Sequence, residues 1–255
     1  MNTQTHLHPD VKNLFKREQA RIPAWKRVID ITCCVLALPA LGLITVVMAA
    51  LQRFSTRGPV LFKQERVGYK GSHFICYKFR TMVVGAETKS HQAYLANLLT
   101  STAPMVKLDS KGDKRLIPGG WLLRATGLDE LPQIINVLKG EMSIVGPRPC
   151  LQYEYEKYED WQRERFDAVP GLTGLWQVSG KNRTTFSEMI RLDIRYAQTS
   201  SFWLDVRIIA MTIPALVIQV METRMSRKGQ AEPARPARIH VQHATAKHKP
   251  QPVAP

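Results

Sequence analysis

The longest uninterrupted apolar segment of the chain lies close to the N-terminus. Residues 31–51 read ITCCVLALPALGLITVVMAAL and contain no charged side chain. At about 1.5 Å per residue, a helix of this length spans roughly 31 Å, which is close to the hydrocarbon thickness of a bilayer. Gln52 and Arg53 follow the run, in place of the small-residue cleavage site of a secretory signal. We therefore expect an uncleaved, membrane-embedded helix over residues 28–52.

The flanks of this run bear on how it lies in the membrane. Basic residues precede it, ending at Lys26 and Arg27, and further basic residues follow it. Lysine and arginine are retained on the cytoplasmic side, so both flanks indicate the same side. Pro39, near the middle, removes a backbone hydrogen bond and favours a bend. A helix that enters, bends and returns accounts for both observations, and a kinked spanning helix is the alternative. The spacing of Lys26 and Asp30 predicts a local ion pair.

Downstream of the run, the pattern predicts an α+β domain that is mostly helical. Strand-forming residues at 60–62 and 74–77 flank a turn-prone stretch at 68–72, which predicts a β-hairpin. Further helices are expected over roughly 150–166, 184–199 and 202–221, the last with a strongly apolar second half that lies along the membrane interface or packs on the core.

The clearest helix is predicted over residues 131–139. Its apolar residues recur at the helical spacing i, i+3, i+4 and i+7, Pro132 lies in the first turn, and Gly140 follows as a terminator. Asp129 and Glu130 consequently lie at the N-terminus of this helix. Carboxylates at that position commonly cap backbone amides and complement the helix dipole, so the pair has a structural explanation as well as a functional one.

Charge divides the remaining chain into regions. The net charge is +15, and residues 1–27, 53–80 and 222–255 carry +4, +6 and +5 of it. Excess positive charge favours nucleic acid, anionic lipid or phosphorylated substrates as partners. Aromatic residues are not interleaved with the basic tail, so we do not expect nucleic acid. We expect a basic segment over 1–27, a catalytic domain over 53–221, and a disordered, lipid-attracted basic tail over 222–255.

Common catalytic and metal-binding patterns do not occur in the chain. The four cysteines lack paired spacing, and neither a Walker loop, a GxGxxG turn nor an HExxH motif is present. We therefore do not expect a zinc site, a disulfide framework or one of the common nucleotide-binding folds.

Basic side chains in rigid or turn-rich segments surround the acidic pair in the sequence. Arg148 lies between two prolines in SIVGPRP, which restricts the backbone that carries its guanidinium. Arginine and lysine beside flexible backbone suit phosphate groups. Convergence of these cations on Asp129 and Glu130 would form a phosphoryl-binding site. The candidate substrate-binding residues are Lys78, Arg80, Arg124, Arg148 and Lys181.

Five motifs together resemble a known family. They read KRVID, GPVLFKQERVG, YKFRTM, LDELPQIINVLKGEMSIVGPRP and PGLTGLWQVSGKN. This combination resembles the bacterial sugar transferases, and specifically the small monotopic polyprenyl-phosphate phosphoglycosyl transferases, over about residues 24–220. Lys181 departs from the family pattern, in which arginine is frequent, and replaces a two-pronged contact with a point charge.

The resemblance implies an enzyme that transfers a sugar-1-phosphate from a UDP-sugar to undecaprenyl (polyprenyl) phosphate and releases UMP. It implies a covalent phosphosugar intermediate on Asp129, with Mg²⁺ held by Glu130 together with Asp129. It further implies a re-entrant helix at Pro39 and a place on the cytoplasmic face of the bacterial inner membrane. Anionic lipid is an expected partner, and a homodimer is possible. Such enzymes initiate lipid-linked glycan, exopolysaccharide or O-antigen synthesis.

Two other functions compete with this interpretation. A membrane-anchored basic module could bind lipid without catalysis, and its binding would survive loss of Asp129 and Glu130. A nucleotide-sugar hydrolase would turn over without a lipid acceptor. The identity of the UDP-sugar is left open by the sequence.

Overall fold

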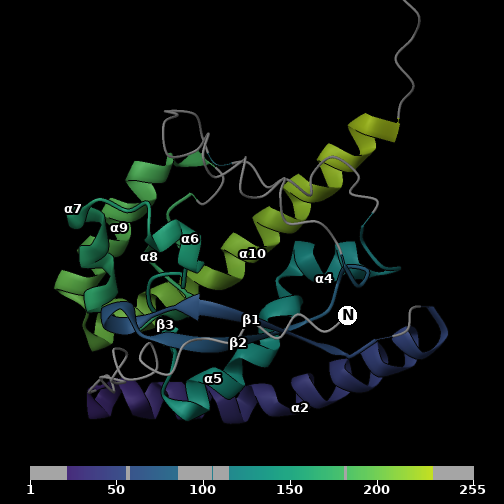
Figure 1. Cartoon of the computed structure of the whole chain (residues 1–255), viewed down its shortest axis with the longest axis horizontal. Coiled ribbons are helices and arrows are strands. Elements are labelled where there is room, and N and C mark those ends of the chain that lie inside the picture. Colours follow the sequence, from purple (N-terminus) through teal and green to yellow (C-terminus); the bar gives the residue numbers. More distant parts are fainter. Residues whose placement is uncertain (1–21, 56–57, 86–104, 106–114, 181–182, 232–255) are drawn as a thin grey trace, which may run out of the picture.

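The computed structural model describes residues 22–55, 58–85, 105, 115–180 and 183–231 (Figure 1). Helices dominate these residues, together with a two-stranded antiparallel hairpin and a two-stranded parallel sheet. The prediction of a mostly helical α+β domain with a hairpin is confirmed, and the parallel sheet is an addition to it. In chain order the elements are α2 (Ala24–Ser55), β1 (Leu61–Val67), η1 (Tyr69–Gly71), β2 (His73–Phe79), α4 (Gly120–Thr126), η3 (Leu128–Gln133), α5 (Ile134–Lys139), β3 (Ser143–Val145), α6 (Gln152–Tyr155), α7 (Asp160–Arg163), η4 (Glu164–Asp167), β4 (Gly171–Thr173), α8 (Leu175–Val178), α9 (Phe186–Thr199) and α10 (Phe202–Ala231).

Helix α2 contains the whole apolar run and lies along one edge of the molecule, beneath α5 and the hairpin (Figure 1). Its inner face packs Cys34 against the core around α5 and Met48 against the end of β2. Its outer face exposes large apolar side chains, with Leu36 75% and Val46 69% exposed. Pro39 lies inside this helix.

The polar residues of α2 point inward. Lys26 Nζ contacts Asp205 Oδ2 of α10 at 2.5 Å. Asp30 Oδ1 accepts hydrogen bonds from Ser143 Oγ and from the Ile144 amide, each at 2.8 Å. The predicted ion pair between Lys26 and Asp30 is therefore wrong, because each side chain reaches a partner from the domain instead.

The hairpin pairs β1 with β2 in antiparallel register and turns through η1, as predicted, although both strands are longer than expected. Lys78 stands opposite Phe62, and Gln64 stands opposite Cys76. Directly opposed residues of an antiparallel pair share one face of the sheet. Strand β2 lies against η3, so the hairpin carries Lys78 to the acidic pair.

The segment from α4 to α5 carries the acidic pair. Helix α4 ends at Gly127, whose left-handed φ of 74° turns the chain into η3. Asp129 and Glu130 lie in the first turn of η3. The predicted helix over 131–139 is present, but it begins as a 3₁₀ turn, in which Pro132 has no amide to donate. It ends at Gly140, as predicted.

The parallel sheet of β3 and β4 depends on two glycines. A Cβ on Gly146 would lie 2.1 Å from the Val169 carbonyl oxygen, and one on Gly171 would lie 2.0 Å from the Gly146 amide nitrogen. These distances exclude any side chain. The close approach anchors the chain at the point where the Pro147–Arg148–Pro149 segment begins.

A second lobe is formed by α6, α7, η4, α8 and α9 around a core that includes Tyr158, Phe166, Trp176, Phe186 and Ile190. The single helix predicted over 150–166 is instead divided into the short turns of α6, α7 and η4. Helix α9 agrees with the prediction over 184–199.

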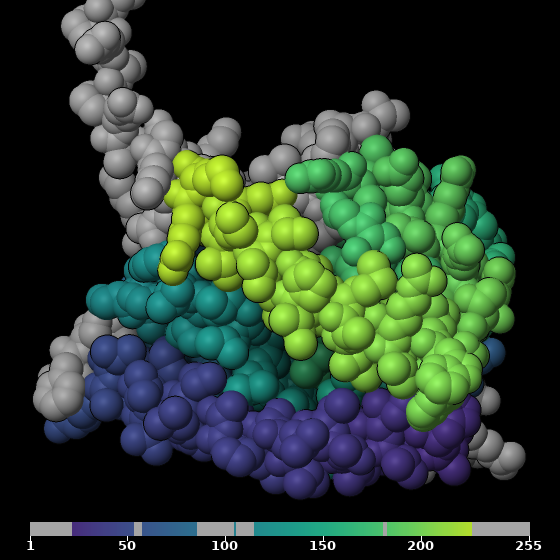
Figure 2. Space-filling view, turned by 180° about the vertical axis from the view of Figure 1, so that it is seen from behind, coloured from purple at the N-terminus to yellow at the C-terminus, as the bar shows by residue number. Residues whose placement is uncertain are grey.

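Helix α10 crosses one face of the molecule obliquely and meets α2 where the two helices begin (Figure 2). The rings of Trp25 and Phe202 make an edge-on contact there, with centroids 6.2 Å apart. Helix α10 continues to Ala231, beyond the predicted tail boundary at 222, and residues 232–255 of that tail lie outside the described residues. Both α2 and α10 are long and apolar enough to cross a membrane.

Candidate active site

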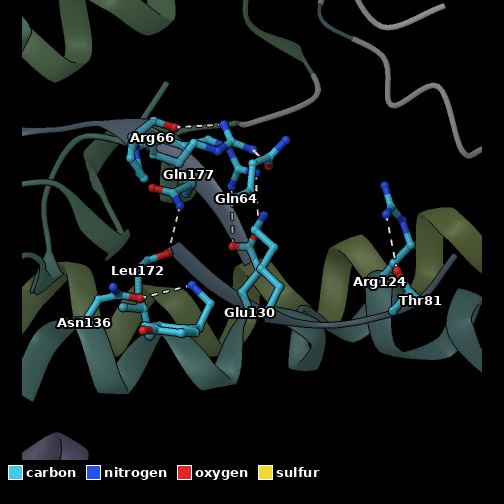
Figure 3. Close-up of polar contacts among 12 residues, drawn as sticks. Gln64, Arg66, Thr81, Arg124, Glu130, Asn136, Leu172 and Gln177 are labelled. Carbon is cyan, nitrogen blue, oxygen red and sulfur yellow. Dashed lines mark hydrogen bonds and ion pairs between the residues drawn. The ribbon is translucent and has the colours of Figure 1, made fainter. Parts of the chain in front are cut away.

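Glu130 forms the centre of a charged cluster built from three segments (Figure 3). Lys78 Nζ, from β2, donates to Glu130 Oε1 at 2.7 Å. Arg148 Nη2, from the loop after β3, donates to the same oxygen at 3.1 Å, and Arg148 Nη1 lies 3.4 Å from Oε2. The structure thus brings together Lys78, Glu130 and Arg148, which are far apart in the sequence.

The two cations determine the ionisation of Glu130. Burial opposes the charged form, but Arg148 and Lys78 together hold the pKa of the Glu130 carboxyl well below its usual range. The charge of Glu130 in turn raises the pKa of Arg148. Glu130 is therefore a carboxylate at neutral pH, and the three side chains together keep one net positive charge.

The backbone that carries Arg148 is held from both sides. Arg165 Nη2 donates to the Arg148 carbonyl at 2.9 Å, and Arg66 Nη1 donates to the Pro149 carbonyl at 3.2 Å. Arg165 is itself fixed by a buried ion pair with Asp193. These supports limit the positions that the Arg148 guanidinium can reach, as substrate alignment requires.

Arg66 belongs to a polar group that was not predicted from the sequence. Arg66 Nη2 donates to Gln64 Oε1 at 2.7 Å, and Gln177, from α8, donates from Nε2 to the Leu172 carbonyl at 3.0 Å (Figure 3). Arg66 Nε and Gln177 Oε1 are buried and form no hydrogen bond with the described residues. The sequence of β1 does contain a sign of this group. Residues i and i+2 of a strand share a face, and Gln64 and Arg66 have this spacing in the segment QER.

Asp129 lies beside Glu130 in the first turn of η3, as predicted, and is 8% exposed. Asp129 is therefore the chain neighbour of the residue at the centre of the charged cluster. The sequence-based assignment of Asp129 as the nucleophile stays a prediction.

The other predicted substrate-binding residues are distributed differently. Arg80 donates from Nε to the Pro59 carbonyl and from Nη2 to Gln52 Oε1, each at 2.8 Å, so it links the hairpin to α2. Arg124 Nη1 lies 3.4 Å from Thr81 Oγ1, apart from the cluster around Glu130 (Figure 3). Lys181 lies outside the described residues.

The carboxylates suit a magnesium ion that the substrate helps to bind. Among the described residues, no group of three or more His, Cys, Asp and Glu side chains is arranged to hold a metal ion. Mg²⁺ in phosphoryl-transfer sites is commonly held by one or two carboxylates together with substrate phosphates and water. Asp129 and Glu130, neighbours in the first turn of η3, would supply such carboxylates, and within the part of the chain that the structure describes Glu130 Oε2 has only the long 3.4 Å contact with Arg148.

Comparison with known proteins identifies the family. A sequence model described as bacterial sugar transferase matches residues 21–219. The chain belongs to the bacterial sugar transferase family.

Several curated relatives of this sugar transferase carry functional names. It is 36% identical to the exopolysaccharide production protein ExoY of Sinorhizobium fredii over 193 residues, which cover 76% of the chain and 85% of ExoY. It is 39% identical over 203 residues to the undecaprenyl-phosphate galactose phosphotransferase of Salmonella typhimurium, covering 78% of the chain and 41% of the relative.

A third relative, from Caulobacter vibrioides, is named UDP-glucose:undecaprenyl-phosphate glucose-1-phosphate transferase and is 38% identical over 201 residues, covering 75% of the chain and 69% of the relative. The chain also spans 42% of the galactosyl transferase CpsE of Streptococcus agalactiae. It therefore corresponds to less than half of the longer relatives and to most of ExoY.

Proposed function

We propose that this sugar transferase moves a sugar-1-phosphate from a UDP-sugar to undecaprenyl phosphate, releases UMP, and thereby initiates a lipid-linked glycan such as an exopolysaccharide or O-antigen. The observation that carries the proposal is the cluster in which Lys78 and Arg148 converge on Glu130, next to Asp129. Phosphoryl transfer requires positive charge around the phosphate oxygens and an aligned nucleophile. The names of the Salmonella and Caulobacter relatives support the donor and acceptor classes.

The proposed reaction has two displacement steps. A carboxylate oxygen of Asp129 attacks the phosphorus that bears the sugar, the bond from this phosphorus to the oxygen bridging the two phosphates breaks, and UMP leaves with the electron pair. A phosphate oxygen of the lipid then attacks the same phosphorus, and the bond to Asp129 breaks. The carboxylate is regenerated, and the product is a lipid diphosphate sugar.

The other residues of the cluster bind and orient the substrate. In this proposal Lys78 and Arg148 neutralise charge on the diphosphate, and their contacts with Glu130 hold the two cations in place. Asp129 and Glu130 would also hold Mg²⁺, which when bound supplies charge neutralisation on the phosphate oxygens. The supports behind Arg148 keep its guanidinium aligned during both steps.

The attachment of α2 supports a re-entrant arrangement. Lys26, near the start of α2, contacts Asp205, and Gln52, near its end, accepts a hydrogen bond from Arg80. Both ends of the helix are thus fixed to the same domain, which would have to enter the bilayer if α2 crossed it. We propose that α2 enters and leaves on the cytoplasmic face of the inner membrane, and that the basic flanks contact anionic lipid.

The reaction is tested by measuring UMP release with purified protein, UDP-sugars, undecaprenyl phosphate and Mg²⁺. Asp129→Asn should abolish release, while Asp160→Asn, which changes a fully exposed carboxylate, should leave it unchanged. Trapping with labelled donor should place the phosphosugar on Asp129. Release without lipid acceptor would favour hydrolysis, and wild-type turnover of Asp129→Asn would contradict the covalent step.

Membrane topology is tested separately by single cysteines introduced just before Lys26 and just after Gln52 in a background without native cysteines. Labelling from the same side of sealed vesicles is expected. Labelling from opposite sides would show that α2 spans the bilayer.

A further inference from the structure

Helix α10 carries a stripe of polar residues on its inner side. Asp205, Thr212 and Gln219 are spaced seven residues apart, which is close to two turns and places them on one face. Each contacts a different part of the domain: Asp205 contacts Lys26, Thr212 Oγ1 lies 2.8 Å from Thr173 Oγ1, and Gln219 contacts α4. The helix is therefore fixed along its length by polar contacts.

Gln219 contacts the end of the helix that precedes the acidic pair. Its side chain is 4% exposed, and Nε2 donates to the Ala125 carbonyl at 2.8 Å and reaches the Arg124 carbonyl at 3.4 Å. Both carbonyls belong to the last turn of α4. The final carbonyls of an α-helix have no partner within the helix, so a side-chain donor there fixes how the helix ends.

The end of α4 leads directly to the proposed nucleophile. Gly127 follows in a left-handed conformation, and a Cβ added to it would lie 3.5 Å from Leu216 of α10, which is an ordinary contact distance. The Glu130 amide then donates to the Gly127 carbonyl at 3.1 Å, which closes the first turn of η3. Helix α10 thus contacts the carbonyls just before this turn, and the side chain of Leu216 lies close to Gly127.

We propose that Gln219 is a positioning residue for the reaction, which it serves by fixing the end of α4 and therefore the orientation of Asp129 and Glu130. This inference rests on the proposed function. Gln219 contacts neither substrate nor the charged cluster in this scheme. It acts through the backbone between Ala125 and Glu130, and it connects α10, with its apolar outer face, to the site of chemistry.

The proposal predicts a particular kinetic effect. Misplacing a nucleophile by about 1 Å can reduce a rate by roughly a hundredfold, whereas donor binding by the cations of the cluster depends less on this alignment. Loss of the Gln219 amide should therefore lower kcat by about 10- to 100-fold and change the KM for the UDP-sugar by less than about threefold. A role limited to stability would not separate kcat from KM in folded protein.

The experiment compares Gln219→Met with Thr223→Val. Methionine keeps the length and approximate volume of glutamine but cannot donate a hydrogen bond. Thr223 lies one turn further along α10, and its hydroxyl bonds to the Gln219 carbonyl at 2.8 Å within the helix. The control variant therefore removes a hydrogen bond of the same helix without removing a bond to α4. Initial UMP-release rates, UDP-sugar binding by calorimetry and thermal unfolding are measured for wild type and both variants in the same detergent.

The inference is supported if Gln219→Met binds the UDP-sugar normally and unfolds as a single cooperative transition, but loses kcat while Thr223→Val keeps it. Wild-type kcat in Gln219→Met overturns it, as does an equal loss in both variants or a loss that follows the unfolded fraction at the assay temperature. Absence of UMP release from the wild-type protein would instead contradict the proposed function.

Discussion

Helices α9 and α10 are consecutive in the chain and each buries an aspartate, Asp193 or Asp205, but the two helices expose different kinds of side chain. In α9 the buried positions include Met189 and Ile190, and the exposed positions include Arg191 and Arg195. In α10 the buried positions include Asp205 at 1% exposure, while Ile213 is 69% exposed. The first arrangement is that of a helix facing water. The arrangement in α10 indicates apolar surroundings on its outer side, because exposing large apolar side chains to water costs free energy.

Helix α2 shares the arrangement of α10 and not that of α9. Its buried residues include Lys26 and Gln52, and its outer face is formed by leucine and valine. The two apolar helices are joined by the Lys26–Asp205 contact, to which Tyr196 of α9 also bonds. One small domain therefore faces two different environments, and buried polar contacts join the helices that face them.

Breaking the Lys26–Asp205 contact between α2 and α10 should destabilise the protein strongly. Lys26→Met should destabilise the protein by about 3–5 kcal/mol, because it leaves the buried charge of Asp205 without its cation. Thermal unfolding in detergent measures the loss. The double variant Lys26→Met with Asp205→Leu should recover much of the stability, since an apolar pair of similar volume replaces the charges. A double variant less stable than the single one would contradict this interpretation of the contact.

A smaller effect is expected from placing charge on the outer face of α10. Ile213→Glu with Val217→Glu should weaken binding to lipid vesicles by about 3 kcal/mol, roughly a hundredfold, because both side chains are exposed on that face. Ser187→Glu with Gln198→Glu adds the same charge to the exposed side of α9 and should leave binding nearly unchanged. Co-sedimentation with vesicles compares the two pairs. Equal weakening would show that the helices do not differ in their surroundings.

The charged cluster around Glu130 should make the stability of the protein depend on pH. Glu130→Gln should cost about 2 kcal/mol at neutral pH, since it removes a charged acceptor from Lys78 and Arg148. Because the pKa of Glu130 is lowered by folding, its stabilising effect is present above the unfolded pKa of about 4.3 and is lost as pH falls toward the folded pKa. Denaturant unfolding of both proteins at a series of pH values should show a constant difference above about pH 5 that shrinks below it. A difference that grows on acidification would contradict the assigned sign.

The smallest effect is expected at the start of α9. Thr185 accepts a hydrogen bond from the Glu188 amide, and Glu188 bonds back to the Thr185 amide, which forms a capping box. Thr185→Ala should lower stability by about 1 kcal/mol and leave vesicle binding unchanged. Thermal unfolding and co-sedimentation test the two parts. A change in vesicle binding would extend the lipid-facing surface to α9.

Local patterns predicted the elements but not their contacts. The apolar run, the hairpin and the helix ending at Gly140 follow from periodicity and turn residues that neighbouring positions supply. Lys78 and Arg148 were candidates because basic residues in rigid or turn-rich segments surround the acidic pair in the sequence, but their contacts with Glu130 depend on the fold. Arg165 and Gln219 were missed because each acts on a backbone carbonyl distant in the sequence, and no side-chain pattern records such a bond.

The contact between Gly146 and Gly171 has a consequence for how the sequence can be altered. A methyl group at either position would lie less than 2.2 Å from the facing main chain. Neither glycine can therefore be replaced even by alanine without moving the Pro147–Arg148–Pro149 segment. Saturation libraries should therefore recover a single residue at both positions, whereas the outward leucines and valines of the first long helix should exchange freely among aliphatic residues. A designer could retune the membrane-facing exterior while holding these two sites constant.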